Sequence, residues 1–95
     1  MEKNNKLIAE FMGNPTIFNP IHDATLYQVK EQSNMTYHID ELEYHTSWDW
    51  LMPVVQKCRQ ENRLEYFDFV YYAIETCDIN ITYKAVVEFI KNQNN

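Results

Sequence analysis

Apolar residues at helical spacing define the segment 47–61, and this pattern constrains the fold more than any other feature of the chain. The main stripe recurs at i, i+3, i+4, i+7 and i+10 and consists of Trp48, Leu51, Met52, Val55 and Cys58. Trp50 and Val54 form a flanking row. Thr46 or Ser47 can cap the start of a helix, and Asp49 in the first turn suits the positive end of its dipole. We therefore predict a helix over 47–61 that is anchored in the core by a wide apolar face.

Three further segments favour helix. Residues 3–12 have an apolar face, and Gly13, the only glycine, follows where a residue with positive φ is needed. At the other end of the chain Asp78 can cap a helix whose stripe comprises Ile79, Tyr83, Val86, Val87 and Ile90. Between them, residues 64–77 are apolar nearly all round, which favours a central or interfacial helix. A strand over 64–70 is the alternative.

Residues 14–45 have the weakest periodicity. The two Asn-Pro steps, at 14–15 and 19–20, predict a loop. The run TLYQV alternates like a strand, QSN is typical of a turn, and MTYHI can return as a second strand, which predicts a hairpin within 24–39. We expect a single domain, 1–95, of helix-dominated α+β class, in which three to four helices pack with a small antiparallel β-hairpin.

The charge balance excludes some partners. The 95 residues carry 14 acidic side chains against 8 Lys and Arg, a formal net charge of −6. Binding to a nucleic-acid backbone requires a basic surface, so it is not expected. An acidic surface instead suits solubility, a basic protein partner or mimicry of nucleic acid. No apolar run approaches the roughly 20 residues that cross a bilayer, and the N-terminal segment does not resemble a signal peptide, so we expect a cytoplasmic protein without membrane contact.

Catalytic and metal-binding patterns are weak. His22, His38 and His45 lack the tight spacing of metal ligands, so no metal or other cofactor is expected. The acidic cluster of Asp40, Glu41 and Glu43 is more typical of a solvated face than of a catalytic carboxylate pair. Since a single glycine cannot form a glycine-rich phosphate loop, we predict that the chain is not an enzyme. Both cysteines, Cys58 and Cys77, are predicted to be small buried hydrophobic residues, with a disulfide as the alternative.

Aromatic residues provide the stronger functional signal, at 15% of the chain. They either fill a core that is low in leucine or form an interaction surface, where aromatic side chains are enriched. The candidate interaction surface combines aromatic with acidic residues: Trp50, Tyr66, Phe69, Tyr71, Tyr72, Asp40, Glu41 and Glu43.

Three blocks carry a resemblance to a known group of proteins. NKLIAEFMG at 5–13, YHTSWDWLMPVV at 44–55 and YKAVVEFIK at 83–91 cover 30 of the 95 residues in order. Together they resemble a family of small proteins encoded by phages and by Bacteroidetes-type genomes and mobile elements. The layout is also remotely similar to the phage ABA-sandwich domain, in which helices flank a small sheet. The family supplies no activity or catalytic residue, and what the resemblance implies is a phage or mobile-element accessory protein.

Two hypotheses for the function follow. In the first, the chain acts by protein–protein interaction, with a host protein as its partner and a host defence component as its target; a homodimer is also considered. In the second, aromatic and histidine side chains form a pocket that sequesters a small ligand such as a nucleotide signal. An exposed patch around Trp50 or Tyr71 favours the first hypothesis, whereas an enclosed cleft with His38 or His45 favours the second.

Overall fold

The computed structural model describes residues 1–61 and 64–93, without the side chains of residues 64–67. This part of the chain forms an elongated molecule of 45 × 26 × 21 Å with four α-helices, two short 3₁₀ helices and a three-stranded antiparallel sheet. The elements in chain order are α1 (Glu2–Phe11), β1 (Thr16–Asn19), β2 (Ala24–Val29), η1 (Lys30–Gln32), β3 (Met35–Tyr37), η2 (Ile39–Glu41), α2 (Trp48–Gln60), α3 (Leu64–Glu75) and α4 (Ile79–Gln93). The predicted helix-dominated α+β class is confirmed.

The first helix ends as the sequence predicts. Gly13 has φ of +71°, its N–H donates to the Glu10 carbonyl at 3.0 Å, and the N–H of Asn14 donates to the Ala9 carbonyl at 3.1 Å. This pair of bonds is a Schellman motif, which satisfies two carbonyls at the end of a helix. The turn directs the chain away from α1 and into the sheet.

The other helices also begin close to their predicted positions. The Asp78 carboxylate accepts hydrogen bonds from the N–H groups of Asn80 at 2.9 Å and Ile81 at 3.3 Å, so it caps α4. Ser47 is the N-cap residue of α2, although its side chain makes no capping hydrogen bond. The ambiguous segment is helical over Leu64–Glu75, so the strand alternative at 64–70 is wrong.

The sheet contains one strand more than predicted. β2 and β3 confirm the hairpin within 24–39, and their connection includes two residues with positive φ, Ser33 and Asn34. Residues 16–19, which we predicted to be loop, instead form β1, with Ile17 paired to Leu26. The prolines on either side bias the residue before them towards extended backbone, which is compatible with a short strand as well as with a loop.

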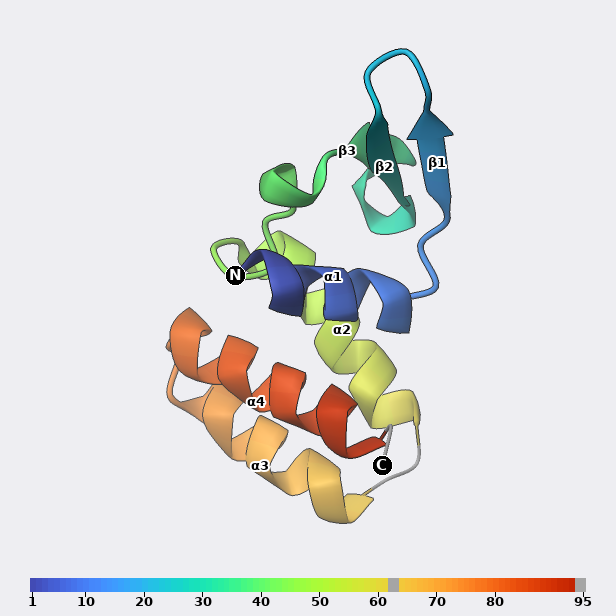
Figure 1. Ribbon diagram of the computed structural model, residues 1–95. Helices are drawn as coiled ribbons and strands as arrows, with labels where there is room; N and C mark the ends of the chain where they lie inside the picture. The colour runs from blue at the N-terminus through green and yellow to red at the C-terminus, as the bar shows by residue number, and fades with distance from the viewer. Residues whose placement is uncertain (62–63, 94–95) are drawn as a thin grey trace.

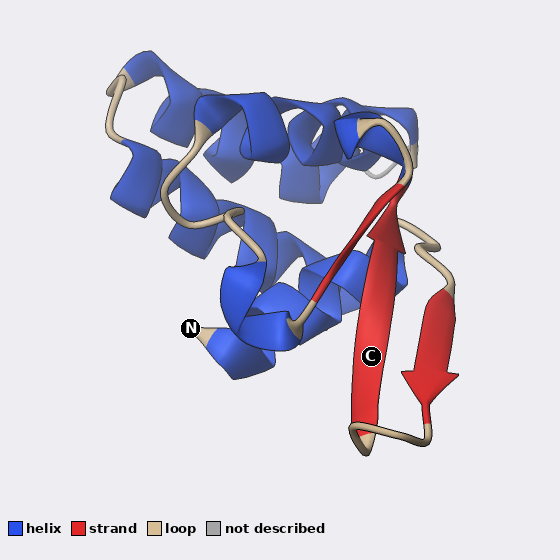
Figure 2. Ribbon diagram, turned by 90° about the horizontal axis from the view of Figure 1, so that it is seen from above, coloured by secondary structure: helices blue, strands red, loops and turns tan. Residues whose placement is uncertain are grey.

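The helices and the sheet occupy opposite ends of the molecule. In Figure 1, α1 and α2 lie between the sheet and the α3–α4 pair, and the hairpin of β1 and β2 projects away from the helices. Figure 2 shows β1 at the outer edge of the sheet. Tyr27 and Val29 join the hydrophobic core, which continues through α2 and α4, whereas the part of the sheet around β1 is exposed. The sheet is therefore only partly covered by the helices.

Candidate functional site

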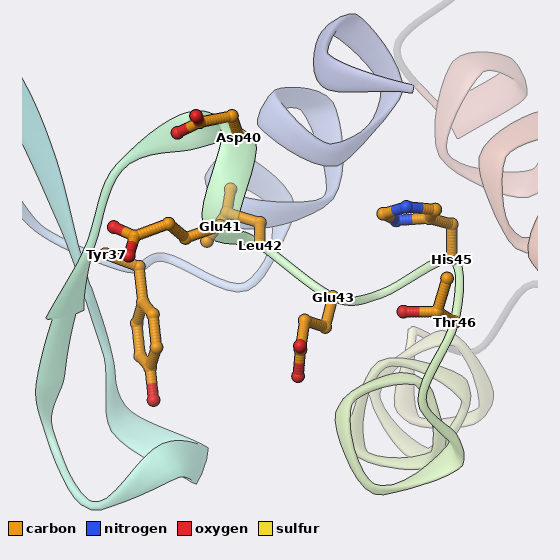
Figure 3. Close-up of a pocket in the computed structure, with 7 residues that line it drawn as sticks. All are labelled: Tyr37, Asp40, Glu41, Leu42, Glu43, His45 and Thr46. Atoms are coloured by element: carbon orange, nitrogen blue, oxygen red, sulfur yellow. The ribbon is translucent and has the colours of Figure 1, made fainter.

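An open depression of about 380 Å³ lies beside η2 and the loop that follows it. Among the residues that the structure describes, its lining comes from a short stretch of chain and contains three carboxylates, one imidazole and no Lys or Arg: Tyr37, Asp40, Glu41, Leu42, Glu43, His45 and Thr46. All three acidic residues of the predicted interaction surface in this region line it, and all three are exposed. The structure thus brings the predicted acidic cluster together at one concave site (Figure 3).

Local hydrogen bonds hold this stretch in place. The Glu41 carboxylate accepts from the N–H of His38 at 2.8 Å, which fixes the turn of η2. Leu42 is fully buried, and its carbonyl accepts from the side-chain amide of Asn5 at 3.1 Å. One carboxylate therefore has a structural role, and the loop is tied to α1 on the far side of the depression.

His45 is oriented by the same asparagine. The Asn5 amide nitrogen lies 3.0 Å from His45 Nδ1, and because that nitrogen is a donor, Nδ1 acts as the acceptor. The proton of the neutral ring then lies on Nε2. The ring also packs edge-on against Tyr83, with 6.0 Å between centroids. His45 is half-buried, and its packing accounts for its position without a ligand.

The three carboxylates do not converge. Figure 3 shows Asp40 and Glu41 directed to the side of Tyr37 and the strand, whereas Glu43 points away from them, between Tyr37 and His45. In the part of the chain that the structure describes, no group of three or more His, Cys, Asp or Glu is placed to hold a metal ion. Diverging carboxylates spread negative charge over a surface, whereas acid–base catalysis requires groups aimed at the same reacting atom. The arrangement suits recognition of a broad basic surface.

The aromatic part of the predicted surface lies elsewhere. Tyr71 and Tyr72 on α3 are 53% and 66% exposed, and their rings contact edge-to-face with 5.9 Å between centroids. A hydrogen bond to Glu75 and the charge of that carboxylate raise the pKa of Tyr71. Phe69 is half-buried against the core, and the side chain of Tyr66 is outside the described residues. In Figure 1, α3 lies at the opposite end of the molecule from η2, so the predicted surface divides into two.

Trp50 is not on either surface. Its side chain is 5% exposed, and it packs edge-to-face with Tyr37 at 5.0 Å and with Tyr44 at 5.2 Å between centroids. Its placement on the interaction surface is therefore corrected, because this large ring fills the junction between α2 and the sheet. Trp48, which we placed in the main stripe, is only half-buried. The buried face of α2 therefore includes the predicted flanking row, Trp50 and Val54, and is centred closer to that row than we predicted.

The two cysteines have different environments. Cys58 is free and fully buried, as predicted, and burial together with the charge of Glu61 raises the pKa of its thiol from 9.0 to about 12. Cys77 is free but exposed, which corrects its predicted burial. It follows the end of α3 with φ of +57°, where the chain leaves the helix. Cys77 thus lies beyond the apolar face on which we placed it.

The sheet carries exposed apolar side chains that we did not predict. Ile17 and Phe18 in β1, Ile21 in the turn and Met35 in β3 are all exposed. We missed Ile17 and Phe18 because we predicted 16–19 to be loop and not strand. Their apolar side chains were therefore not assigned to a surface of the sheet. Ile17, Phe18 and Ile21 form a further candidate contact region on the projecting hairpin of β1 and β2, and Met35 lies at the other edge of the sheet.

Comparisons with known proteins add no relative. No family model, curated protein or solved structure matches the chain. Among the described residues, none of the helices has the length and apolar character needed to span a bilayer. The geometry of the site therefore carries the functional argument.

Proposed function

We propose that this protein acts by protein–protein interaction and that the depression beside η2 is the surface that binds a basic segment of its partner. The observation that carries the proposal is the grouping of Asp40, Glu41 and Glu43 around one open depression, whose lining has no Lys or Arg among the described residues. A basic segment that lies across the depression is attracted by several carboxylates along its length, and the net charge of −6 steers it towards the site.

An aromatic side chain in the lining of the depression also supports a protein partner. Tyr37 is half-buried and packs on Trp50, so it presents a rigid aromatic surface beside the carboxylates. An aromatic anchor with surrounding charge is the composition of many protein-binding surfaces. Because the loop is held by Asn5 and by the bond between Glu41 and His38, little ordering is needed on binding.

The biological context comes from the three sequence blocks that resemble small phage and mobile-element proteins. A small acidic chain with a preformed binding surface suits an accessory factor that occupies a site on a larger protein. We accordingly propose a host protein as the partner, acting in the host cytoplasm, and a host defence component as the specific target.

The competing hypothesis, sequestration of a nucleotide signal, draws on the size of the depression and on His45 in its lining. Its volume of about 380 Å³ lies within the usual range for small-ligand pockets. However, a nucleotide carries phosphate charge, and the three carboxylates would repel it at short range. The acidic lining therefore favours a basic protein segment over an anionic ligand.

Affinity capture of the tagged protein from a bacterial host lysate, with analysis of both proteins and small molecules, tests the proposal. We expect a stoichiometric protein that is released as the ionic strength of the wash rises, because charge attraction is screened by salt. A co-purifying nucleotide without any protein would contradict the proposal and support the competing hypothesis.

A further inference from the structure

We propose that two copies of this chain associate through the free edge of β1, pairing antiparallel about a twofold axis so that two three-stranded sheets become one continuous sheet. This inference concerns the projecting hairpin and does not depend on the proposed function of the depression beside η2.

The outer edge of β1 is open. Within residues 1–61 and 64–93, β1 pairs with β2 on one side only, in the order β1-β2-β3, and Figure 2 shows no described element beyond it. The N–H of Gln28 donates to the Pro15 carbonyl at 2.9 Å, which makes residues 15 and 28 a hydrogen-bonded pair. Because such pairs alternate along antiparallel strands, the backbone groups of Thr16 and Phe18 point away from β2. These two residues therefore offer unpaired N–H and C=O groups to a further strand.

Prolines limit how another strand can pair. Pro15 and Pro20 lie on either side of the four-residue strand, and neither has an N–H to donate. A twofold axis at Ile17 places Thr16 of one copy opposite Phe18 of the other, so that each such pair exchanges both of its backbone hydrogen bonds. A shift of the axis by one residue towards Pro20 places Thr16 opposite that proline, where one of the bonds is lost. The strand is thus self-complementary about Ile17.

The side chains on this edge also favour association. Ile17 is 46% exposed and Phe18 is 59% exposed, on opposite faces of the sheet. Pairing about Ile17 would bring the two Ile17 side chains together on one face and lay each Phe18 ring beside Thr16 of the other copy on the other face. Cross-strand contacts of this kind stabilise sheets by roughly 0.2–1 kcal/mol per pair.

The distribution of charge favours a second copy of this chain as the partner that pairs with the edge of β1. Residues 14–29 contain only one charged side chain, Asp23, in a chain with a net charge of −6. Exposed edges of monomeric sheets are commonly protected by charged residues, and β1 has none. Two copies can therefore meet at this edge without bringing their acidic residues together. The isologous contact closes on itself, so it gives a dimer and not a fibre.

A four-residue strand gives a small interface, so the dimer is expected to form in a concentration-dependent way. Sedimentation velocity over a range of protein concentrations should show the wild-type chain changing from monomer to dimer. Ile17→Lys would place two positive charges on the twofold axis and should leave a monomer throughout. Met35→Lys adds the same charge to an exposed residue of β3, at the other edge of the sheet, and should dimerise like the wild type.

A cross-link tests the register directly. Residues opposite each other at the axis have Cα atoms about 4.5 Å apart, within the roughly 4.4–6.8 Å that a disulfide requires. In a Cys77→Ser background, Ile17→Cys should give a covalent dimer on mild oxidation, whereas Met35→Cys should not. A wild-type chain that stays monomeric, dimerisation of Ile17→Lys equal to wild type, or equal cross-linking of both cysteine variants would overturn the proposal. Circular dichroism on each variant establishes that it is folded.

Discussion

The Tyr83 hydroxyl donates a buried hydrogen bond to Asn5 Oδ1 at 2.8 Å, across 78 positions of the chain. The amide nitrogen of the same asparagine reaches the Leu42 carbonyl and His45 Nδ1. Asn5 is 1% exposed, so one side chain from α1 connects α4 with the loop that forms the acidic depression. The acidic depression is consequently positioned by the core and not only by its own short turn.

Replacing Asn5 with alanine should lower the free energy of unfolding by about 2–4 kcal/mol, because it leaves several buried polar groups without partners. Urea denaturation followed by circular dichroism measures this change. Asn92→Ala, at an exposed position of α4, is the matched control and should change stability by less than about 0.5 kcal/mol. Equal effects of the two substitutions would show that the Asn5 hydrogen bonds do not stabilise the fold.

Stability should decrease at alkaline pH. Burial raises the pKa of Tyr83 from 10.0 to about 12, and burial with the charge of Glu61 raises that of Cys58 from 9.0 to about 12. Burial, and then the charge of Glu31, also raises the pKa of Tyr44. Above the unfolded pKa the unfolded chain releases protons that the folded chain retains, so unfolding becomes more favourable as pH rises. The contribution of each group to the free energy of unfolding is intact below the pKa of that group in the unfolded chain. It is lost as the pH rises from that value to the pKa of the group in the folded chain.

The unfolding free energy measured from pH 8 to 11 should therefore fall, by up to about 1.4 kcal/mol per pH unit for each group that ionises only in the unfolded state. Cys58→Ala should make the dependence shallower, beginning near pH 9. Cys77→Ala removes the exposed thiol and is the control. A stability that is constant to pH 11 would contradict the raised pKa values of these buried groups. An unchanged slope in Cys58→Ala would contradict the contribution of the Cys58 thiol.

The two tryptophans of α2 should differ in their effect on stability. Trp50→Ala removes a buried ring that contacts Tyr37 and Tyr44, and it should cost about 3–5 kcal/mol, as for other large core truncations. Trp48→Ala should cost clearly less, since that ring is half-buried. Chemical denaturation of both variants measures the difference. A larger loss for Trp48→Ala would mean that the inward face of α2 is the one we first predicted.

The helices could be predicted from sequence because their signals are local. Gly13 ends α1 and Asp78 caps α4 within a few residues of the apolar pattern that each delimits. The inward face of α2 was less predictable: Trp48 and Trp50 both belong to apolar rows, and the choice between them depends on where the sheet packs. Cys77 was misplaced for a related reason, because periodicity shows a face but not the residue at which the helix ends.

The candidate site was partly predictable. Asp40, Glu41 and Glu43 are neighbours in sequence, so their shared location required no tertiary information. The hydrogen bonds from Asn5 to Leu42 and His45 span 37 and 40 positions, and nothing local indicates them. β1 was missed because four residues between two prolines are too few for strand alternation to be recognised. The apolar edge at Ile17 and Phe18 was missed with it.

Binding of the captured partner to a variant with a less acidic depression is the most direct test of the central claim. Asp40→Asn combined with Glu43→Gln removes two charges and leaves Glu41, which fixes η2, intact. Glu10→Gln combined with Glu88→Gln removes the same charge from exposed positions on α1 and α4. Calorimetric titration should show affinity at least about tenfold lower for the first variant, roughly 1.4 kcal/mol, with the control near wild type. Equal affinities for the two variants would contradict the assignment of the depression as the binding surface.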